Sequence, residues 1–115
     1  MEKQPRPKKM FGKTVKMTTG CGSLYVTVNV NGNAIFEVSG ILGKTGGCAK
    51  AQTEAITRCV SLGLRYGVPI EEFIRGLAGI SCPESIWDEG EQVLSCPDAI
   101  SKAIKLCEIK EVNNE

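Results

Sequence analysis

The sequence predicts an α+β fold with a small antiparallel sheet of about three strands, followed by three helices packed on it. Three observations predict this fold: apolar and polar residues alternate early in the chain, an Asn-Gly-Asn turn separates two such stretches, and helical spacing replaces the alternation after residue 47. A length of 115 residues suits one domain. We expect a flexible basic leader over residues 1–10, a single domain over residues 11–112 and a tail over residues 113–115.

The strands are expected in the first 42 residues. A strand that starts at residue 11 should end at Gly20-Cys21-Gly22. Residues 24–30 alternate apolar and polar side chains with the period of a half-buried strand. Asn31-Gly32-Asn33 favours a hairpin because Asn and Gly tolerate positive φ. The return strand is expected over residues 34–38, extending as far as Leu42.

The first helix is expected over residues 48–66, which contain no proline. Helical spacing places Gln52, Ile56, Cys59, Val60 and Gly63 on one face, which we expect to pack on the core. Gly67 should end this helix, since glycine readily adopts the left-handed conformation of a helix stop. A second helix is expected over residues 70–79.

The last helix is expected to begin near Ser95-Cys96-Pro97-Asp98, where Pro97 fits the first turn and the polar side chains can bind free amides. Its apolar face carries Ile100, Ile104 and Cys107. Residues 80–95 look irregular, and we expect Trp87 to anchor them on the core. The alternative is that Trp87 and its acidic neighbours form a partner-binding loop.

Composition and charge exclude several kinds of protein. The chain has no histidine, which excludes a Ser-His-Asp triad, a Cys-His protease and a Cys/His zinc finger. Residues 1–16 contain six basic residues and one acidic residue, a net charge of +5, whereas residues 17–115 contain eight basic and twelve acidic residues, a net charge of −4. The acidic body makes nucleic-acid binding unexpected. No apolar stretch is long enough for a membrane span or a secretory signal, so we expect a cytoplasmic protein.

Four of the six cysteines lie at element ends beside glycine or proline: Cys21, Cys48, Cys82 and Cys96. Free backbone amides and helix N-termini stabilise thiolates at such places, and four thiolates can complete a zinc site without histidine. No two of these cysteines have the Cys-x₂-Cys spacing, so a metal site, a redox dithiol and unrelated thiols all stay open from the residues alone. Cys59 and Cys107 lie on apolar helical faces and are expected to pack in the core.

Gly43-Lys44-Thr45, between a strand and a helix, resembles part of a phosphate-binding loop. A full Walker motif also needs a glycine at position 38, which is valine here. We therefore do not expect nucleotide binding at this loop.

Several short motifs occur in a consistent order along residues 6–107: Thr19-Gly20-Cys21-Gly22, Leu24-Tyr25-Val26, Gly46-Gly47-Cys48-Ala49, Cys82-Pro83 and Ser95-Cys96-Pro97-Asp98-Ala99-Ile100. In these motifs the chain resembles the TSCPD domain, which occurs at the C-terminus of adenosylcobalamin-dependent (class II) ribonucleotide reductases and in free-standing four-cysteine proteins. One departure is Leu94, where the name-giving motif has threonine.

The resemblance implies a metal site formed by Cys21, Cys48, Cys82 and Cys96, with zinc as the expected metal and an iron–sulfur cluster as the alternative. It implies an accessory module that supports deoxyribonucleotide synthesis beside a ribonucleotide reductase catalytic subunit and is not catalytic alone. Adenosylcobalamin would bind only to that partner. The alternatives are a redox-relay dithiol that delivers electrons to a reductase subunit, and a protein-interaction module.

Overall fold

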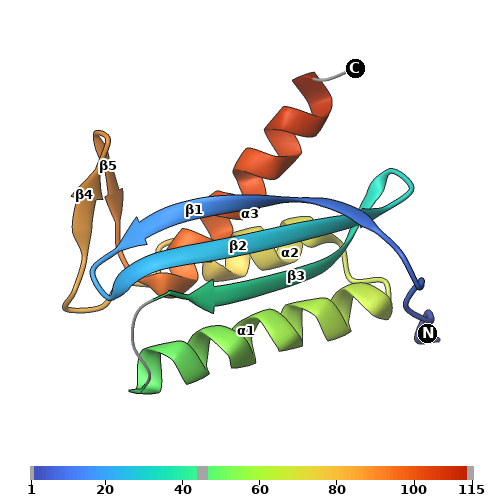
Figure 1. The fold of residues 1–115 in the computed structure, drawn as a ribbon, viewed down its shortest axis with the longest axis horizontal. Coiled ribbons are helices and arrows are strands. Elements are labelled where there is room, and N and C mark those ends of the chain that lie inside the picture. The colour runs from blue at the N-terminus through green and yellow to red at the C-terminus, as the bar shows by residue number, and fades with distance from the viewer. Residues whose placement is uncertain (1, 44–46, 114–115) are drawn as a thin grey trace.

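The computed structural model describes residues 2–43 and 47–113, with side chains described as far as residue 108. Its elements follow the order β1 (Phe11–Thr19), β2 (Gly22–Asn31), β3 (Ala34–Leu42), α1 (Gly47–Arg65), α2 (Ile70–Leu77), β4 (Ile86–Asp88), β5 (Glu91–Val93) and α3 (Cys96–Asn113). The first three strands form an antiparallel sheet in the order β1-β2-β3 (Figure 1). The predicted α+β fold, with three strands in this sheet and three helices, is confirmed.

The sheet is a meander with one face toward the helices. β1 and β2 pair from Phe11 opposite Val30 to Thr19 opposite Gly22. The β2–β3 hairpin turns at Gly32, whose φ of 69° fits the predicted turn, and its register shifts between Asn29 and Val30. α2 and α3 lie behind the sheet in Figure 1, and α1 runs alongside β3.

The core forms between the inner face of the sheet and α3, because both elements present aliphatic side chains there. Burying such side chains is the main favourable term in folding. The residues with at most 2% exposure include Leu24, Val26, Val28, Val38, Leu42, Ala99, Ile100, Ala103, Ile104 and Cys107.

α1 ends as the sequence predicts, but it buries a different face. Gly67, with φ of 96°, accepts the left-handed conformation that closes the helix, while the amide of Val68 donates to the carbonyl of Gly63 at 3.0 Å. The buried residues of α1 are Thr53, Thr57, Val60 and Leu64. On the predicted face, Val60 is buried and Ile56 packs partly buried against the core, but the expectation was wrong for Gln52 and Cys59, which are exposed.

Two threonines explain the rotated face of α1. The hydroxyls of Thr53 and Thr57 donate to the carbonyls of Ala49 and Thr53, at 2.9 and 3.1 Å, within the helix itself. Their methyl groups are then free to face Gly40 of β3, where a side chain on the strand would approach both methyls to 3.2 Å. A residue type that looks polar in the sequence therefore packs here as an apolar one.

Residues 80–95 are not wholly irregular, as the sequence suggested. They contain β4 and β5, which form a short antiparallel hairpin that stands apart from the main sheet (Figure 1). Trp87 lies on β4 and is 70% exposed, so the prediction that it anchors this segment on the core was wrong. Val93, on β5, is the buried residue of the hairpin.

Candidate functional site

Three of the predicted ligand cysteines lie at one corner of the molecule, where the β1–β2 turn meets the segment after α2 and the start of α3. Thr19 joins the first and last of these. Its hydroxyl donates to the carbonyl of Gly22 at 2.8 Å and accepts from the amide of Cys21 at 3.1 Å. The Sγ atom of Cys96 lies 3.9 Å from the same oxygen. The local fold of the turn thus brings Cys21 toward the first residue of α3.

The third cysteine reaches the corner through close packing of the backbone. A side chain at Gly20 would come within 1.8 Å of the carbonyl oxygen of Glu84, so only glycine fits between the turn and this segment. The amide of Cys82 donates to the carbonyl of Leu94 at 3.0 Å, which ties the segment to the residues before α3. Cys82 is half-buried as a result, like Cys21, while Cys96 is buried.

The three thiols influence one another electrostatically. Burial raises the pKa of the Cys21 thiol, and the neighbouring Cys96, Cys82 and Glu84 raise it further because each disfavours a second negative charge. A hydrogen bond with Cys96 acts in the same direction. The Cys21 thiol therefore stays protonated near neutral pH unless a cation compensates the charge of its thiolate.

Cys48 is placed differently. It occupies the second position of α1, is exposed, and follows Gly47, whose φ is 85°. The described residues place no group of three or more Cys, Asp and Glu side chains for holding a metal ion. None of the six cysteines, all of which lie in the described part of the chain, forms a disulfide. The structure thus brings together Cys21, Cys82 and Cys96, and the four-cysteine metal site stays a prediction.

The two cysteines assigned to the core differ from each other. Cys107 is 2% exposed on the inner face of α3, as predicted. Cys59 is exposed on α1, so its assignment to the core was wrong. The cause is the rotated face of that helix, on which Thr57 and Val60 are buried in its place.

The first turn of α3 fixes the neighbouring segment through polar contacts. The Ser95 hydroxyl accepts from the amide of Asp98 at 3.2 Å, which caps the helix, and donates to the carbonyl of Ile80 at 2.5 Å. The carboxylate of Asp98 accepts from the amides of Gly79 and Leu94, both at 3.0 Å. These two side chains hold both ends of the segment that carries Cys82 and the β4–β5 hairpin.

Asp98 is the most deeply buried acid described, at 1% exposure. Burial by itself would raise its pKa. The amides of Gly79 and Leu94 and the ammonium of Lys102, whose Nζ lies 3.1 Å from Oδ2, together hold its pKa below the ordinary value of 3.8. Asp98 is therefore charged at neutral pH. Its clamping role is missing from the sequence prediction, although the Ser95-x-x-Asp98 spacing marked both residues as amide partners.

Comparison with known proteins decides the family. The TSCPD domain matches residues 1–107. The chain belongs to the TSCPD domain family. No curated protein and no solved structure matches it. Membership suggests a ribonucleotide reductase-associated domain.

In this TSCPD chain, the segment that matches the name-giving motif lies at the corner. Ser95 and Asp98 are its structural residues, because each binds backbone groups of the preceding segment. Cys96, between them, is the residue whose thiol faces Thr19 and Cys21. The motif thus combines two positions that fix the backbone with one that presents a sulfur atom.

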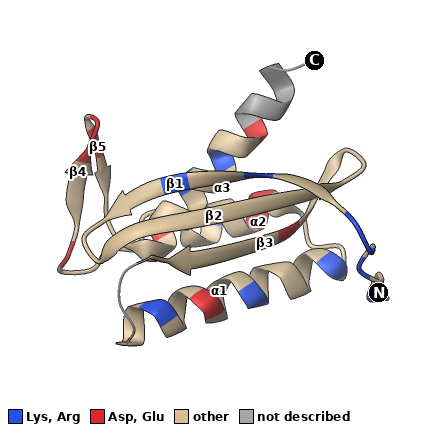
Figure 2. Cartoon of the chain, in the orientation of Figure 1, with Lys and Arg blue, Asp and Glu red and all other residues tan. Residues whose placement is uncertain are grey.

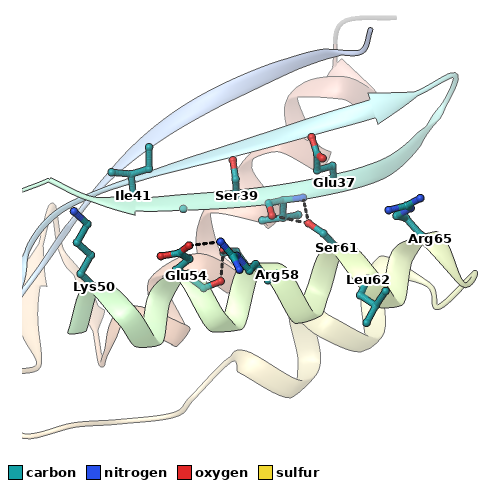
Figure 3. A pocket seen from close by; sticks show the side chains of 12 residues that line it. Glu37, Ser39, Ile41, Lys50, Glu54, Arg58, Ser61, Leu62 and Arg65 are labelled. Atoms are coloured by element: carbon teal, nitrogen blue, oxygen red, sulfur yellow. Dashed lines mark hydrogen bonds and ion pairs between the residues drawn. The ribbon is translucent and has the colours of Figure 1, made fainter. Parts of the chain in front are cut away.

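A groove of about 750 Å³ lies between β3 and α1 (Figure 3). The hydroxyl of Ser61 closes its floor, donating to the carbonyl of Val38 at 2.7 Å and accepting from the amide of Val38 at 3.0 Å. Glu54 and Arg58 pair at 2.6 Å along its rim. No cysteine lines this groove, so it is separate from the predicted site.

Part of the predicted leader packs at the end of the groove. Arg6 forms two hydrogen bonds with the carboxylate of Glu37, at 2.7 and 3.0 Å, and Gln4 exchanges hydrogen bonds with Arg65 through its own amide and carbonyl. The hydrogen bonds from Arg6 lower the pKa of Glu37 despite its partial burial. These leader residues therefore bind to the body of the same chain.

Two further expectations concern the loop before α1 and the membrane. The Gly43-Lys44-Thr45 motif falls largely on residues 44–46, which lie outside the described residues. Among the helices of the described chain, none is long and apolar enough to cross a membrane.

Proposed function

We propose that this TSCPD chain is an accessory domain of ribonucleotide reductase in which Cys21, Cys48, Cys82 and Cys96 bind one zinc ion. The observation that carries the proposal is the convergence of Cys21, Cys82 and Cys96 from three separate segments. The reductase link rests on the family. Adenosylcobalamin would bind to the catalytic domain of the partner, since residues 1–107 match the TSCPD domain alone.

The donor set suits zinc. Four thiolates complete a tetrahedral zinc shell, and the absence of histidine leaves sulfur as the available soft ligand. Cys48 is exposed at the first turn of α1, so its thiol is not held in the core, and the four-cysteine pattern of the resemblance makes it the proposed fourth ligand. Zinc, when bound, would supply a cross-link among distant segments and compensate the charges of the thiolates.

The corner also fits a structural role for the ion. Apart from Val93 and Ser95, the side chains of residues 79–95 are not buried, so apolar packing contributes little to holding this segment. In small metal domains the free energy of metal binding adds directly to the free energy of folding. A zinc ion at the corner would therefore stabilise the segment where the core stabilises it least.

The proposal is tested by elemental analysis of the purified chain together with a count of its reactive thiols. We expect about one zinc per chain. Replacing Cys21, Cys48, Cys82 or Cys96 by serine should release the metal and lower the unfolding temperature. Cys59→Ser is the matched control, because Cys59 is an exposed thiol on the same helix as Cys48, and it should retain the metal.

Two outcomes would contradict the zinc site. A colourless chain with neither zinc nor iron and with all exposed thiols reactive would refute metal binding. Visible absorbance in anaerobically purified protein, with iron in place of zinc, would replace zinc by an iron–sulfur cluster on the same ligands.

A second candidate, a redox dithiol, is favoured by the hydrogen bond between Cys21 and Cys96. In this reaction the two thiols would form one disulfide and pass two electrons and two protons to a disulfide of the reductase subunit. Its prediction differs from that of zinc: Cys21→Ser and Cys96→Ser would abolish electron transfer but leave the unfolding temperature unchanged. The raised pKa of Cys21 does not separate the two candidates, because a nucleophilic thiol and a zinc ligand must both lose their proton.

A further inference from the structure

The β4–β5 hairpin exposes a tryptophan that the fold does not use. Trp87 is 70% exposed and pairs across the hairpin with Gln92, whereas Ile86 and Val93, on the opposite face, point toward the body. Exposed tryptophans are uncommon on monomeric surfaces, and tryptophan is among the residues enriched at the energetic centres of protein interfaces. The outer face of this hairpin is thus a sheet face without a partner in the described chain.

The charge around Trp87 indicates what kind of partner fits. Asp88, Glu89 and Glu91 surround the tip of the hairpin, which is red in Figure 2. Lys102 lies 3.8 Å from Glu91, but no basic side chain in the described residues forms an ion pair with Asp88 or Glu89. The tip therefore carries uncompensated negative charge within two residues of an exposed indole ring: Glu89 lies in the turn, whereas Asp88 and Glu91 lie on the face opposite Trp87.

An exposed indole next to an acidic turn matches the chemistry of arginine and lysine. Their cations bind the face of an indole ring and are attracted by the neighbouring carboxylates. The same carboxylates repel the phosphates of nucleic acids and the head groups of anionic membranes. Among macromolecules, a basic protein surface is thus the one that both features of the hairpin favour.

The turn of the hairpin presents these groups on a defined backbone. Glu89 and Gly90 both have positive φ, at 52° and 80°, which is the geometry of a tight two-residue turn between antiparallel strands. A short, defined hairpin loses little conformational freedom on docking, which favours affinity.

We infer that the β4–β5 hairpin is a docking surface for a basic protein partner that places an arginine or lysine on Trp87. This inference rests on the proposed function for the identity of the partner, the ribonucleotide reductase catalytic subunit. The chemistry of the hairpin is a property of this chain and can be tested separately.

The first experiment measures binding of the purified catalytic subunit to the full chain, using the emission of Trp87 and sedimentation. Trp87 is the single tryptophan of the chain. The same titration with Trp87→Ala at equal concentration gives the emission of the subunit's own tryptophans, which is subtracted. We expect Trp87→Ala to weaken binding at least about tenfold. Glu89→Gln with Glu91→Gln should weaken it less and reduce its dependence on salt. Leu62→Ala, which removes an exposed leucine on α1, is the control and should bind normally.

A second experiment titrates the chain alone with hexa-arginine and follows the emission of Trp87. Saturable quenching that Glu89→Gln with Glu91→Gln abolishes supports the chemistry assigned to the hairpin. An emission that does not change overturns it. Circular dichroism of each variant verifies that the fold is retained, which is expected because Trp87 makes little contact with the core.

The outcomes separate the inference from the proposed function. If the subunit binds equally well to Trp87→Ala, the hairpin is not the docking surface, although the reductase association stands. If the subunit does not bind the wild-type chain, the proposed partner is wrong. The hexa-arginine titration alone then shows whether the hairpin binds basic groups. A wild-type dimer that Trp87→Ala dissociates would assign the surface to a second copy and overturn the basic partner, as would equal binding to neutral lipid vesicles.

Discussion

The core between the sheet and α3 and the segment from residue 79 to residue 95 are stabilised in different ways. In the core, ten aliphatic or small side chains from β2, β3 and α3 are almost completely buried, so many contacts share the stabilisation. In the segment, only Val93 and Ser95 are buried. Its position is set by directional contacts, chiefly those of Asp98 and Ser95. Removing a single side chain should therefore change the position of the cysteine corner more than it changes the arrangement of the core.

The largest effect should come from the core. Leu24→Ala deletes a completely buried side chain of the central strand and leaves a cavity, which should cost about 3–5 kcal/mol of the free energy of unfolding. The loss should be global, because β2 pairs with both other strands. Urea unfolding followed by circular dichroism measures it. Leu62→Ala, at an exposed leucine, is the control, and an equal loss there would contradict a core localised at the inner face of the sheet.

Asp98→Asn tests whether residues 79–95 depend on single contacts as the core does not. We expect it to lower the free energy of unfolding by about 2–3 kcal/mol. The amide group presents only one acceptor oxygen, so one of the two amides, of Gly79 or Leu94, loses its partner. Hydrogen exchange should accelerate across residues 79–95 before it accelerates in β2. Glu91→Gln is the matched control. It removes the more distant of the two acidic partners of Lys102 and leaves Asp98 in place. Uniform acceleration through the whole chain would show that the two regions are not separate.

Lowering the pH should weaken the same hydrogen bonds of Asp98, and the loss in free energy of unfolding should be smaller than in Asp98→Asn as long as the pH is only moderately low. The pKa of Asp98 is lowered in the folded state, so the unfolded state binds more protons as the pH falls. The stabilisation is present above the ordinary pKa of 3.8 and is lost as the pH falls through the lower folded value. Unfolding midpoints measured from neutral pH downward should decrease below about pH 4. Asp98→Asn should make this decrease shallower, and an unchanged slope would exclude Asp98 as its source.

The smallest effect should come from the leader. Arg6→Ala removes the ion pair with Glu37, which lies at the surface, where solvent and salt weaken such pairs. We expect an almost unchanged unfolding temperature but faster hydrogen exchange near residues 4–6. Lys8→Ala, which removes another leader cation, is the control. A large loss of stability in Arg6→Ala would mean that the leader belongs to the core structure.

The sequence predicts the main sheet and the helices because their patterns are long. Residues 24–30 alternate over a whole strand, and Gly32 and Gly67 mark a hairpin and a helix end with the positive φ that glycine allows. β4 and β5 escaped prediction because each has three residues, too few for an alternating pattern to be distinguished from chance. The exposure of Trp87 follows from that hairpin and was therefore also missed.

The sequence predicts which cysteines form the candidate site, but it does not predict how close they lie to one another. Cys21, Cys82 and Cys96 all lie at element ends, which could be seen from the neighbouring glycines and prolines. Their proximity depends on contacts between distant segments, such as the packing of Gly20 on Glu84, which no local pattern encodes. The face of α1 was misjudged because Thr53 and Thr57 bind their own helix and turn methyl groups toward the sheet.

The position of α3 at the end of the fold has a consequence for synthesis on the ribosome. The inner face of the sheet is complete once Leu42 has been made, but α3, which covers it, begins only at Cys96. At translation rates of about 5–20 residues per second, the aliphatic face is exposed for about 3–11 s before the first residue of α3 is synthesised. A nascent chain at this stage is a plain target for chaperones, and a transcript truncated before Cys96 should yield a product prone to aggregation.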